Sequence, residues 1–183
     1  MITLIRNAKK KSIFIQEWGK ETTTNTKYIA VSLIQWNDEY AVSVKHGGIG
    51  KNPEYTSENY DLIFFKNKPN RFYDKAVTFR SPYVNEKVKH VGFVNKTTIS
   101  RFGNVLDQKG SLEKVEYSLT NASTMTGMSG GPIYSEDNKS IVGMSTHKTN
   151  NITIDGKIES NIALFIQANV IQDEWNKFID KNN

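Results

Sequence analysis

Short runs of apolar and β-branched residues alternate with polar turns along most of this 183-residue chain. Residues 28–36 and 40–44 form two such runs, and the turn sequence Asn37-Asp38-Glu39 between them predicts a β-hairpin. Further short strands are predicted at residues 62–65, 76–79, 86–93, 97–100, 115–118, 131–134, 140–145 and 161–166. Gly, Asn, Asp or Pro separates these strands at a spacing that is typical of antiparallel barrels.

The period of the apolar residues changes near the end of the chain. From Ala168 to about Asp180 they recur at helical spacing and form one apolar face, made of Val170, Ile171, Trp175, Phe178 and Ile179. This pattern predicts a single terminal helix after many strands. Because a doubly wound α/β sheet needs helices between its strands, the pattern excludes that class and predicts an all-β fold.

Composition narrows the range of partners and locations. The chain has a net charge of +5, but its lysines are scattered and no aromatic residues are interleaved with them, so no nucleic-acid partner is predicted. No run approaches the roughly 20 apolar residues of a membrane span, and no membrane association is predicted. Cysteine is absent, which excludes disulfides, thiolate metal sites and a cysteine nucleophile. We expect a cytoplasmic protein if Met1 is native, and a secreted one if a leader was removed.

The most informative motif is the run Gly127-Met128-Ser129-Gly130-Gly131-Pro132. A serine between glycines lies on a tight turn, where the N–H groups of Gly127 and Ser129 can point into one small space. That arrangement suits attack on a carbonyl and stabilisation of the oxyanion that forms. The motif also matches the nucleophile elbow of α/β-hydrolases, but that fold needs an acid and then a histidine after the serine. The strands that follow Ser129 exclude this alternative.

A serine nucleophile needs a histidine base within hydrogen-bonding reach. His46 ends a predicted strand and precedes two glycines, so one side of its ring is held while the other is open to substrate. His90 lies inside a predicted strand and is expected to be an ordinary strand residue. His147 follows Ser129 in the chain and is expected in a pocket or on the surface. His46 is therefore the predicted base.

The base in turn needs a carboxylate that orients its ring and stabilises the imidazolium. Asp61 directly precedes the apolar run 62–65, which would place its carboxylate against an apolar surface that excludes water. Asp38 and Asp74 are alternatives in more loop-like surroundings, so Asp61 is the first choice among three.

The order His46, Asp61, Ser129 resembles that of the chymotrypsin-like serine proteases. The resemblance implies two antiparallel six-stranded β-barrels and a C-terminal α-helix. It implies an N-terminal lobe at residues 1–80 with the histidine and the aspartate, and a C-terminal lobe at residues 81–183 with the serine. Within this family, the chain resembles the branch that contains glutamyl endopeptidases, exfoliative toxins and compact viral proteases. The local likeness lies in the run Ile141-Val-Gly-Met144, in Lys148 close behind it and in the terminal helix.

The same resemblance implies a binding pocket for the substrate residue before the cut. Its predicted lining is Ser123, Thr124, Ser145, Thr146 and His147. No acidic residue is among them, so a preference for Lys or Arg is not expected. Hydroxyls with a histidine suit a polar side chain such as Glu or Gln, because a buried charged or amide group needs hydrogen-bond partners.

These features predict a serine endopeptidase that cleaves protein or peptide substrates through an acyl-enzyme and requires no metal or cofactor. The predicted roles are base for His46, orienting carboxylate for Asp61 and nucleophile for Ser129. A second hypothesis is a protease-fold module that binds a protein partner and is inactive or weakly active. It is motivated by the short separation of 15 residues between His46 and Asp61 and by the unusual residues before the histidine.

Overall fold

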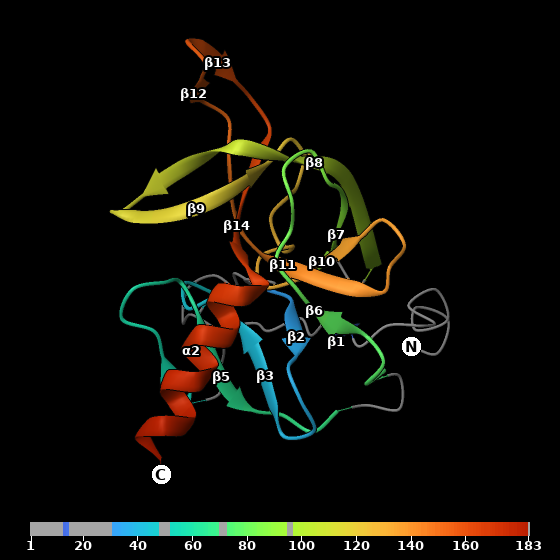
Figure 1. Cartoon of the computed structure of the whole chain (residues 1–183), viewed down its shortest axis with the longest axis vertical. Helices are drawn as coiled ribbons and strands as arrows, with labels where there is room; N and C mark the ends of the chain where they lie inside the picture. Colours follow the sequence, from blue (N-terminus) through green and yellow to red (C-terminus); the bar gives the residue numbers. More distant parts are fainter. Residues whose placement is uncertain (1–12, 15–30, 48–51, 70–72, 95–96, 183) are drawn as a thin grey trace, which may run out of the picture.

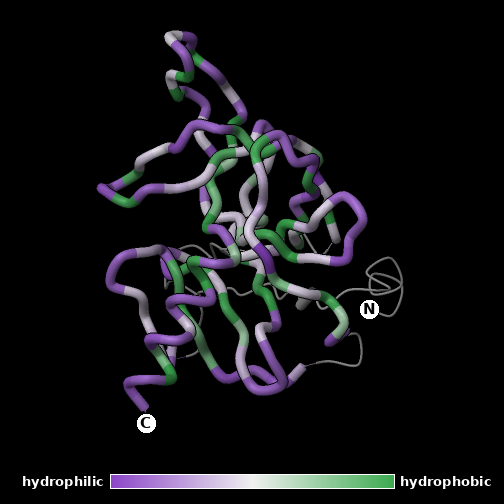
Figure 2. The backbone as a smooth tube through the Cα atoms, in the orientation of Figure 1, coloured by the Kyte–Doolittle hydropathy of each residue, from purple (hydrophilic) through white to green (hydrophobic). Residues whose placement is uncertain are grey.

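The computed structural model describes residues 13–14, 31–47, 52–69, 73–94 and 97–182. Its strands form two large sheets, which lie one above the other in Figure 1, and a separate two-stranded sheet; the helix α2 (Ala168–Lys181) lies beside the lower large sheet. Apolar residues follow the strands of both sheets, and polar residues gather at the turns between them (Figure 2). The fold is therefore all-β with one C-terminal helix, as predicted.

The first sheet is built from the N-terminal part of the chain. Its five strands, in spatial order, are β1 (Ile13–Phe14), β2 (Leu33–Gln35), β3 (Tyr40–Ser43), β5 (Ile63–Lys66) and β4 (Tyr55–Thr56), and all neighbours are antiparallel. The predicted hairpin is confirmed as β2 and β3. Asn37 supplies its turn, because its Oδ1 accepts hydrogen bonds from the N–H groups of Glu39 and Tyr40, both at 2.9 Å.

The second sheet closes on itself. It contains β6 (Thr78–Phe79), β7 (Lys87–Val94), β8 (Thr97–Leu112), β9 (Val115–Thr120), β10 (Pro132–Ser135), β11 (Ser140–Thr149) and β14 (Ile162–Gln167). Because β10 pairs with both β7 and β11, six of these strands form a closed antiparallel ring, and β6 joins β11 outside it through a parallel pairing. The hairpin of β12 (Ile152–Ile154) and β13 (Lys157–Glu159) projects beyond the ring (Figure 1).

The terminal helix packs against the first sheet, although its residues belong to the predicted C-terminal lobe. Phe178 is buried, and its ring lies 6.3 Å from that of Phe64 in β5 and 5.4 Å from that of Tyr40 in β3. Trp175 meets Phe64 edge-on at 5.1 Å. Trp175 and Phe178 of the predicted apolar face thus pack on the first sheet, whereas Ile179 is 38 % exposed. The division of the chain at residue 80 stays a prediction.

Two features of the strands differ from the sequence prediction. Residues 97–100 were expected to form a short strand, yet β8 runs on to Leu112, past Gly103 and Gly110. The backbone of β8 pairs with β7 on one side and with β9 on the other. These pairings extend the strand through residues whose local sequence favours a turn. The short strands β1, β4, β12 and β13 were not predicted, and residues 28–30 of the first predicted strand lie outside the described residues.

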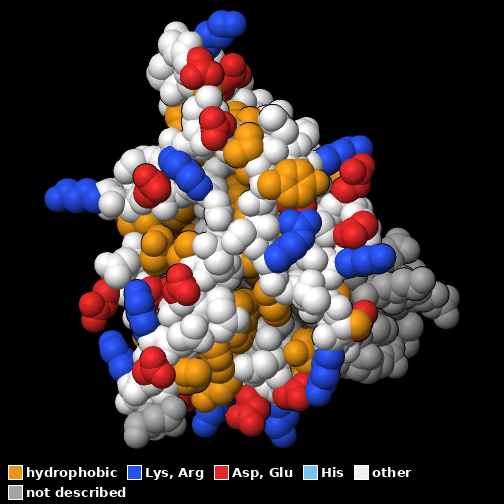
Figure 3. Space-filling model, viewed as in Figure 1, with side chains coloured by type: hydrophobic (Ala, Val, Ile, Leu, Met, Phe, Trp, Pro, Cys, Tyr) orange, Lys and Arg blue, Asp and Glu red, His pale blue; other side chains and the backbone are white. Residues whose placement is uncertain are grey.

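The face of the molecule shown in Figure 3 carries basic and acidic side chains interspersed over its surface. This agrees with the scattered charges of the sequence. Within the described residues, no helix is long and apolar enough to cross a membrane.

Candidate active site

The serine loop between β9 and β10 requires its glycines. Gly127 has a φ of 98° and Gly130 a φ of 84°, both in the region that favours glycine. A Cβ on Gly130 would also lie 2.0 Å from the carbonyl oxygen of Ser32. The motif therefore allows the loop to lie directly against Ser32, next to β2 of the first sheet.

Ser32, the residue before β2, connects this loop to β7, and its contacts could not be predicted from the sequence. Its hydroxyl donates to the carbonyl oxygen of Gly127 at 3.0 Å and accepts the N–H of Phe93 in β7 at 3.0 Å. Its own N–H donates to the carbonyl oxygen of Ser129 at 2.7 Å. Ser32 is fully buried, so these bonds hold the loop without competition from water.

The two N–H groups predicted to form the oxyanion hole are left available by the fold. The neighbouring amides of Met128, Gly130 and Gly131 donate to backbone carbonyls at 2.7–3.1 Å. Among the described residues, the N–H groups of Gly127 and Ser129 donate no hydrogen bond. Both therefore remain free to bind a developing oxyanion.

His46 is held by Asp61, as the sequence order predicts. The Asp61 Oδ2 contacts His46 Nδ1, and Asp61 Oδ1 accepts the backbone N–H of His46 at 2.9 Å. Asp61 is only 7 % exposed. Burial raises its pKa, but the hydrogen bonds and charge of His46 outweigh that effect, and the pKa lies below its ordinary value. The carboxylate therefore stays ionised at neutral pH.

The two alternative carboxylates lie elsewhere. Asp38 pairs with Lys75 on the surface at 2.5 Å, and Asp74 accepts the N–H of Ala76 in a turn at 2.9 Å. Of these three aspartates, Asp61 is the one that the tertiary structure brings to the imidazole of His46.

His147 lies beside this pair. Its ring stacks on that of His46 at a centroid distance of 4.6 Å, and its Nε2 is 3.8 Å from Asp61 Oδ2. Burial lowers the pKa of His147, and so does the neighbouring His46, while Asp61 and Glu113 act in the opposite direction. Its pKa falls below the ordinary value, so His147 is neutral at pH 7.

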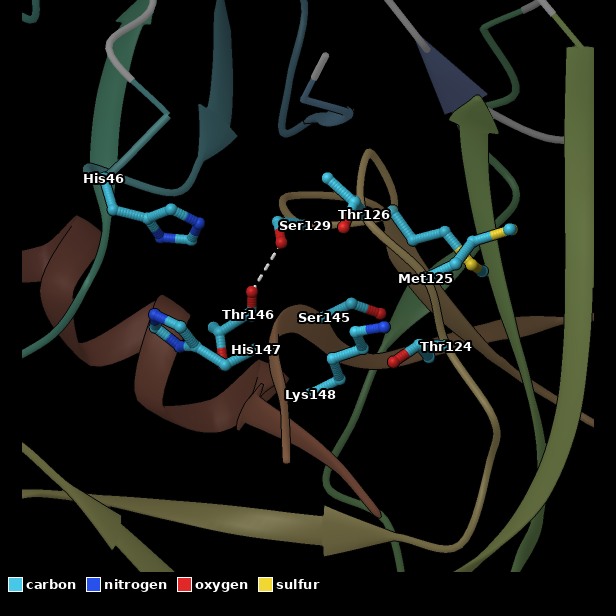
Figure 4. Close-up of a pocket in the computed structure, with 10 residues that line it drawn as sticks. His46, Thr124, Met125, Thr126, Ser129, Ser145, Thr146, His147 and Lys148 are labelled. Atoms are coloured by element: carbon cyan, nitrogen blue, oxygen red, sulfur yellow. Dashed lines mark hydrogen bonds between the residues drawn. The ribbon is translucent and has the colours of Figure 1, made fainter. Parts of the chain in front are cut away.

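A pocket of about 240 Å³ opens between His46 and the serine loop (Figure 4). Its lining consists of His46, Thr124, Met125, Thr126, Met128, Ser129, Ser145, Thr146, His147 and Lys148. Four of the five residues predicted to bind substrate are in this lining. Ser123 is not among them and is exposed to solvent, because the chain turns into the pocket only at the next residue.

The Ser129 hydroxyl is directed at Thr146 rather than at His46 in this structure. It donates to the carbonyl oxygen of Thr146 at 2.6 Å, and no hydrogen bond joins it to His46 (Figure 4). Ser129 and His46 nevertheless line the same pocket. A rotation about the Cα–Cβ bond of Ser129 moves the hydroxyl between staggered positions, at the cost of one hydrogen bond of about 1 kcal/mol.

His90 was predicted to be an ordinary strand residue, but it supports the pocket wall. It is fully buried, with Nδ1 at 2.7 Å from Ser145 Oγ and Nε2 at 2.8 Å from Thr120 Oγ1. Burial lowers its pKa to about 3, so the ring is neutral. The period-2 alternation that buries Val88 also turns His90 inward, and this was the only signal in the sequence.

Comparisons with known proteins agree with this geometry at the level of the fold. Neither protein-family models nor curated protein sequences match the chain. Among solved structures, the crystal structure of the serine endoprotease from Yersinia pestis matches with a TM-score of 0.70 and 14% identity, over 100% of this chain and 68% of that chain. This chain has a chymotrypsin-like protease fold. The likeness to a narrower branch of that family stays a prediction.

We expect replacement of Ser32 with alanine to lower kcat for any substrate by about tenfold. This loss is smaller than the loss of kcat on removing an oxyanion donor, because Ser32 only holds the loop that carries the proposed donors. The Gly127 carbonyl and the Phe93 N–H would lose their buried partner, which also costs about 1–3 kcal/mol of stability. Steady-state kinetics and denaturant unfolding measure the two effects.

Ser43→Ala is the matched control, because it removes a buried hydroxyl that lies beside Gly130 but donates its hydrogen bond to the Ser32 carbonyl oxygen, at 2.6 Å, and not to the serine loop. Equal losses of kcat in the two variants would contradict the proposed role of Ser32.

Proposed function

We propose that the protein is a serine endopeptidase in which Ser129 is the nucleophile, His46 the base and Asp61 the carboxylate that orients the base. The observation that carries this proposal is the contact between His46 and Asp61 beside a pocket that also contains Ser129. The likeness to a serine endoprotease fold supports it. The expected substrates are proteins or peptides, because the pocket is open to solvent beside the nucleophile.

The proposed reaction follows from the positions of these groups. Ser129 Oγ turns toward His46 Nε2, gives up its proton to that nitrogen and attacks the peptide carbonyl. The N–H groups of Gly127 and Ser129 stabilise the oxyanion. His46 then gives the proton to the leaving amine, and water hydrolyses the acyl-enzyme by the reverse sequence. Asp61, ionised and bound to Nδ1, stabilises the imidazolium at each step.

The hydrogen bonds of His90 determine what the pocket wall offers to a substrate side chain. The Thr120 hydroxyl oxygen accepts the N–H of Ala122 at 3.4 Å, and His90 Nε2 lies 2.8 Å from the same oxygen. We propose that Thr120 donates its proton to Nε2, so that His90 carries its own proton on Nδ1 and donates it to Ser145 Oγ. The Ser145 hydroxyl, which lines the pocket, is left to donate its proton into it.

Lys148 lines the same pocket and adds a positive charge. A hydroxyl donor with a nearby ammonium group favours a side chain that accepts hydrogen bonds and carries negative charge. We therefore propose that the residue before the cut is Glu, ahead of Gln, which makes the polar preference expected from the sequence more specific.

Cleavage profiling of a peptide library tests this preference. We expect Glu to dominate, and Ser145→Ala to lower kcat/KM for a Glu substrate by about tenfold or more, because a hydrogen bond to a charged group is lost. Lys148→Gln should reduce the ratio of Glu to Gln cleavage, whereas Lys139→Gln, an exposed change outside the pocket, should not. A dominant basic or aromatic preference would contradict the proposed pocket chemistry.

One observation favours the second hypothesis, an inactive protease-fold module. The Ser129 hydroxyl is bound to Thr146 and not to His46. A fluorophosphonate probe separates the two hypotheses, because it labels only a serine that its base can activate. Labelling of Ser129, together with hydrolysis of an unfolded protein substrate, supports the endopeptidase. Absence of both supports the module.

A further inference from the structure

Three side chains that commonly bind transition metals meet at the edge of the pocket. We propose that His46, Asp61 and His147 form a reversible Zn²⁺ site, and that its occupation switches the protein off. The inhibition rests on the proposed function, whereas the binding of the ion does not.

The donor atoms are close enough to share one ion. One nitrogen or oxygen atom from each of the three residues lies within 4.8 Å of the other two. Zinc bonds of about 2.0–2.2 Å in a tetrahedral site bring ligand atoms to roughly 3.4 Å from one another. Shifts of the donor atoms by about 1 Å therefore complete the site. The exposed side chain of His46 can make such a shift by rotating.

Asp61 can bind the ion without leaving its place. Its Oδ1 is held by the backbone N–H of His46, and its Oδ2 faces both imidazoles, touching His46 Nδ1 and lying 3.8 Å from His147 Nε2. The carboxylate is thus anchored through one oxygen and offers the other to the ion.

The chemistry of these donors favours Zn²⁺ over Ca²⁺ and Mg²⁺. Two imidazoles and a carboxylate suit Zn²⁺, with a fourth position open to water, while Ca²⁺ and Mg²⁺ prefer oxygen ligands. The Nδ1 atom of His147 is buried and has no hydrogen-bond partner among the described residues. Since such outer partners are worth about 10–100-fold in metal affinity, we expect micromolar rather than nanomolar binding.

Occupation of the site would block the proposed reaction. When the ion binds His46 Nδ1, the proton on that nitrogen is released to solvent, and the ring loses its bond to Asp61. The ion then holds the ring in place of Asp61, so the carboxylate no longer orients His46 or stabilises its imidazolium. The base is consequently disabled while the pocket itself remains intact.

Binding is measured first on Ser129→Ala, which keeps all three ligands and cannot digest itself. Calorimetry with Zn²⁺ alone should give one site per chain, and Co²⁺ should give the visible absorption of a tetrahedral site. His147→Gln should weaken binding at least tenfold. Glu113→Gln is the matched control, because it removes a charge near His147 but no ligand.

Several outcomes would overturn the site. These are no Zn²⁺ binding by the Ser129→Ala protein, or binding that His147→Gln leaves unchanged. If His147→Gln does not fold, carbethoxylation of the histidines in the Ser129→Ala protein replaces it, and Zn²⁺ must then protect both His46 and His147.

Hydrolysis by the wild-type protein distinguishes the regulation from the proposed function. Activity that falls in step with Zn²⁺ occupancy and returns with a chelator supports the switch. Activity that persists at saturating Zn²⁺ overturns the switch and leaves the proposed function standing. Zn²⁺ binding by a wild-type protein without hydrolysis supports the site and overturns the proposed function.

Discussion

Replacement of Ser129 with alanine is expected to lower peptide hydrolysis by about 10⁶-fold, to the level that binding and oxyanion stabilisation alone provide. The nucleophile is lost, while His46, Asp61 and the backbone N–H groups of the loop are kept. The variant loses one hydrogen bond, to the Thr146 carbonyl, which is worth about 1 kcal/mol, so it should fold and still bind substrate.

Active-site titration with a fluorophosphonate and single-turnover hydrolysis measure this effect. Ser111→Ala is the matched control, because it makes the same chemical change at an exposed position of β8. Hydrolysis by Ser129→Ala at the wild-type rate would show that another group is the nucleophile and would end the proposed mechanism.

Replacement of Asp61 with asparagine is expected to lower kcat by about 10⁴-fold at neutral pH. The amide keeps the shape of the carboxylate, but its NH₂ group can donate to His46 Nδ1 and favours the tautomer with the proton on Nε2. That tautomer cannot accept the proton of Ser129. Asp74→Asn, in a surface turn, is the control and should leave kcat unchanged.

The same substitution has a pH-dependent effect on stability. The pKa of Asp61 is lower in the folded protein than in the unfolded chain, so its ionisation stabilises the fold above the unfolded value of about 4. This contribution is lost as pH falls through the lowered folded pKa. Denaturant unfolding should therefore show a difference between wild type and Asp61→Asn at pH 6 that shrinks below pH 4. A difference that grows with acid would contradict the assigned pKa direction.

The elements that were predicted correctly depend on local patterns. The hairpin around Asn37, the helix after Ala168 and the serine loop each combine short-range periodicity with turn residues whose backbone preferences are intrinsic. The glycines of the loop were informative because Gly127 and Gly130 need positive φ angles that other residues rarely adopt.

The features that were missed depend on contacts between distant segments. The roles of Ser32 and His90 arise from partners that lie 95 and 55 residues away, Gly127 and Ser145 respectively. Nothing in the residues next to them marks these bonds. The length of β8 is also set by its neighbours in the barrel, which pair with it across two glycines.

The sequence alone determined the all-β class, the terminal helix and the presence of a glycine-rich serine loop, because periodicity and glycine conformation are properties of the local chain. The tertiary structure alone decided which aspartate meets His46, that His147 stacks on His46, and that the helix covers the first sheet. These outcomes depend on how the two sheets and the helix pack around shared apolar side chains, and residues far apart in the chain become neighbours only when that packing is complete.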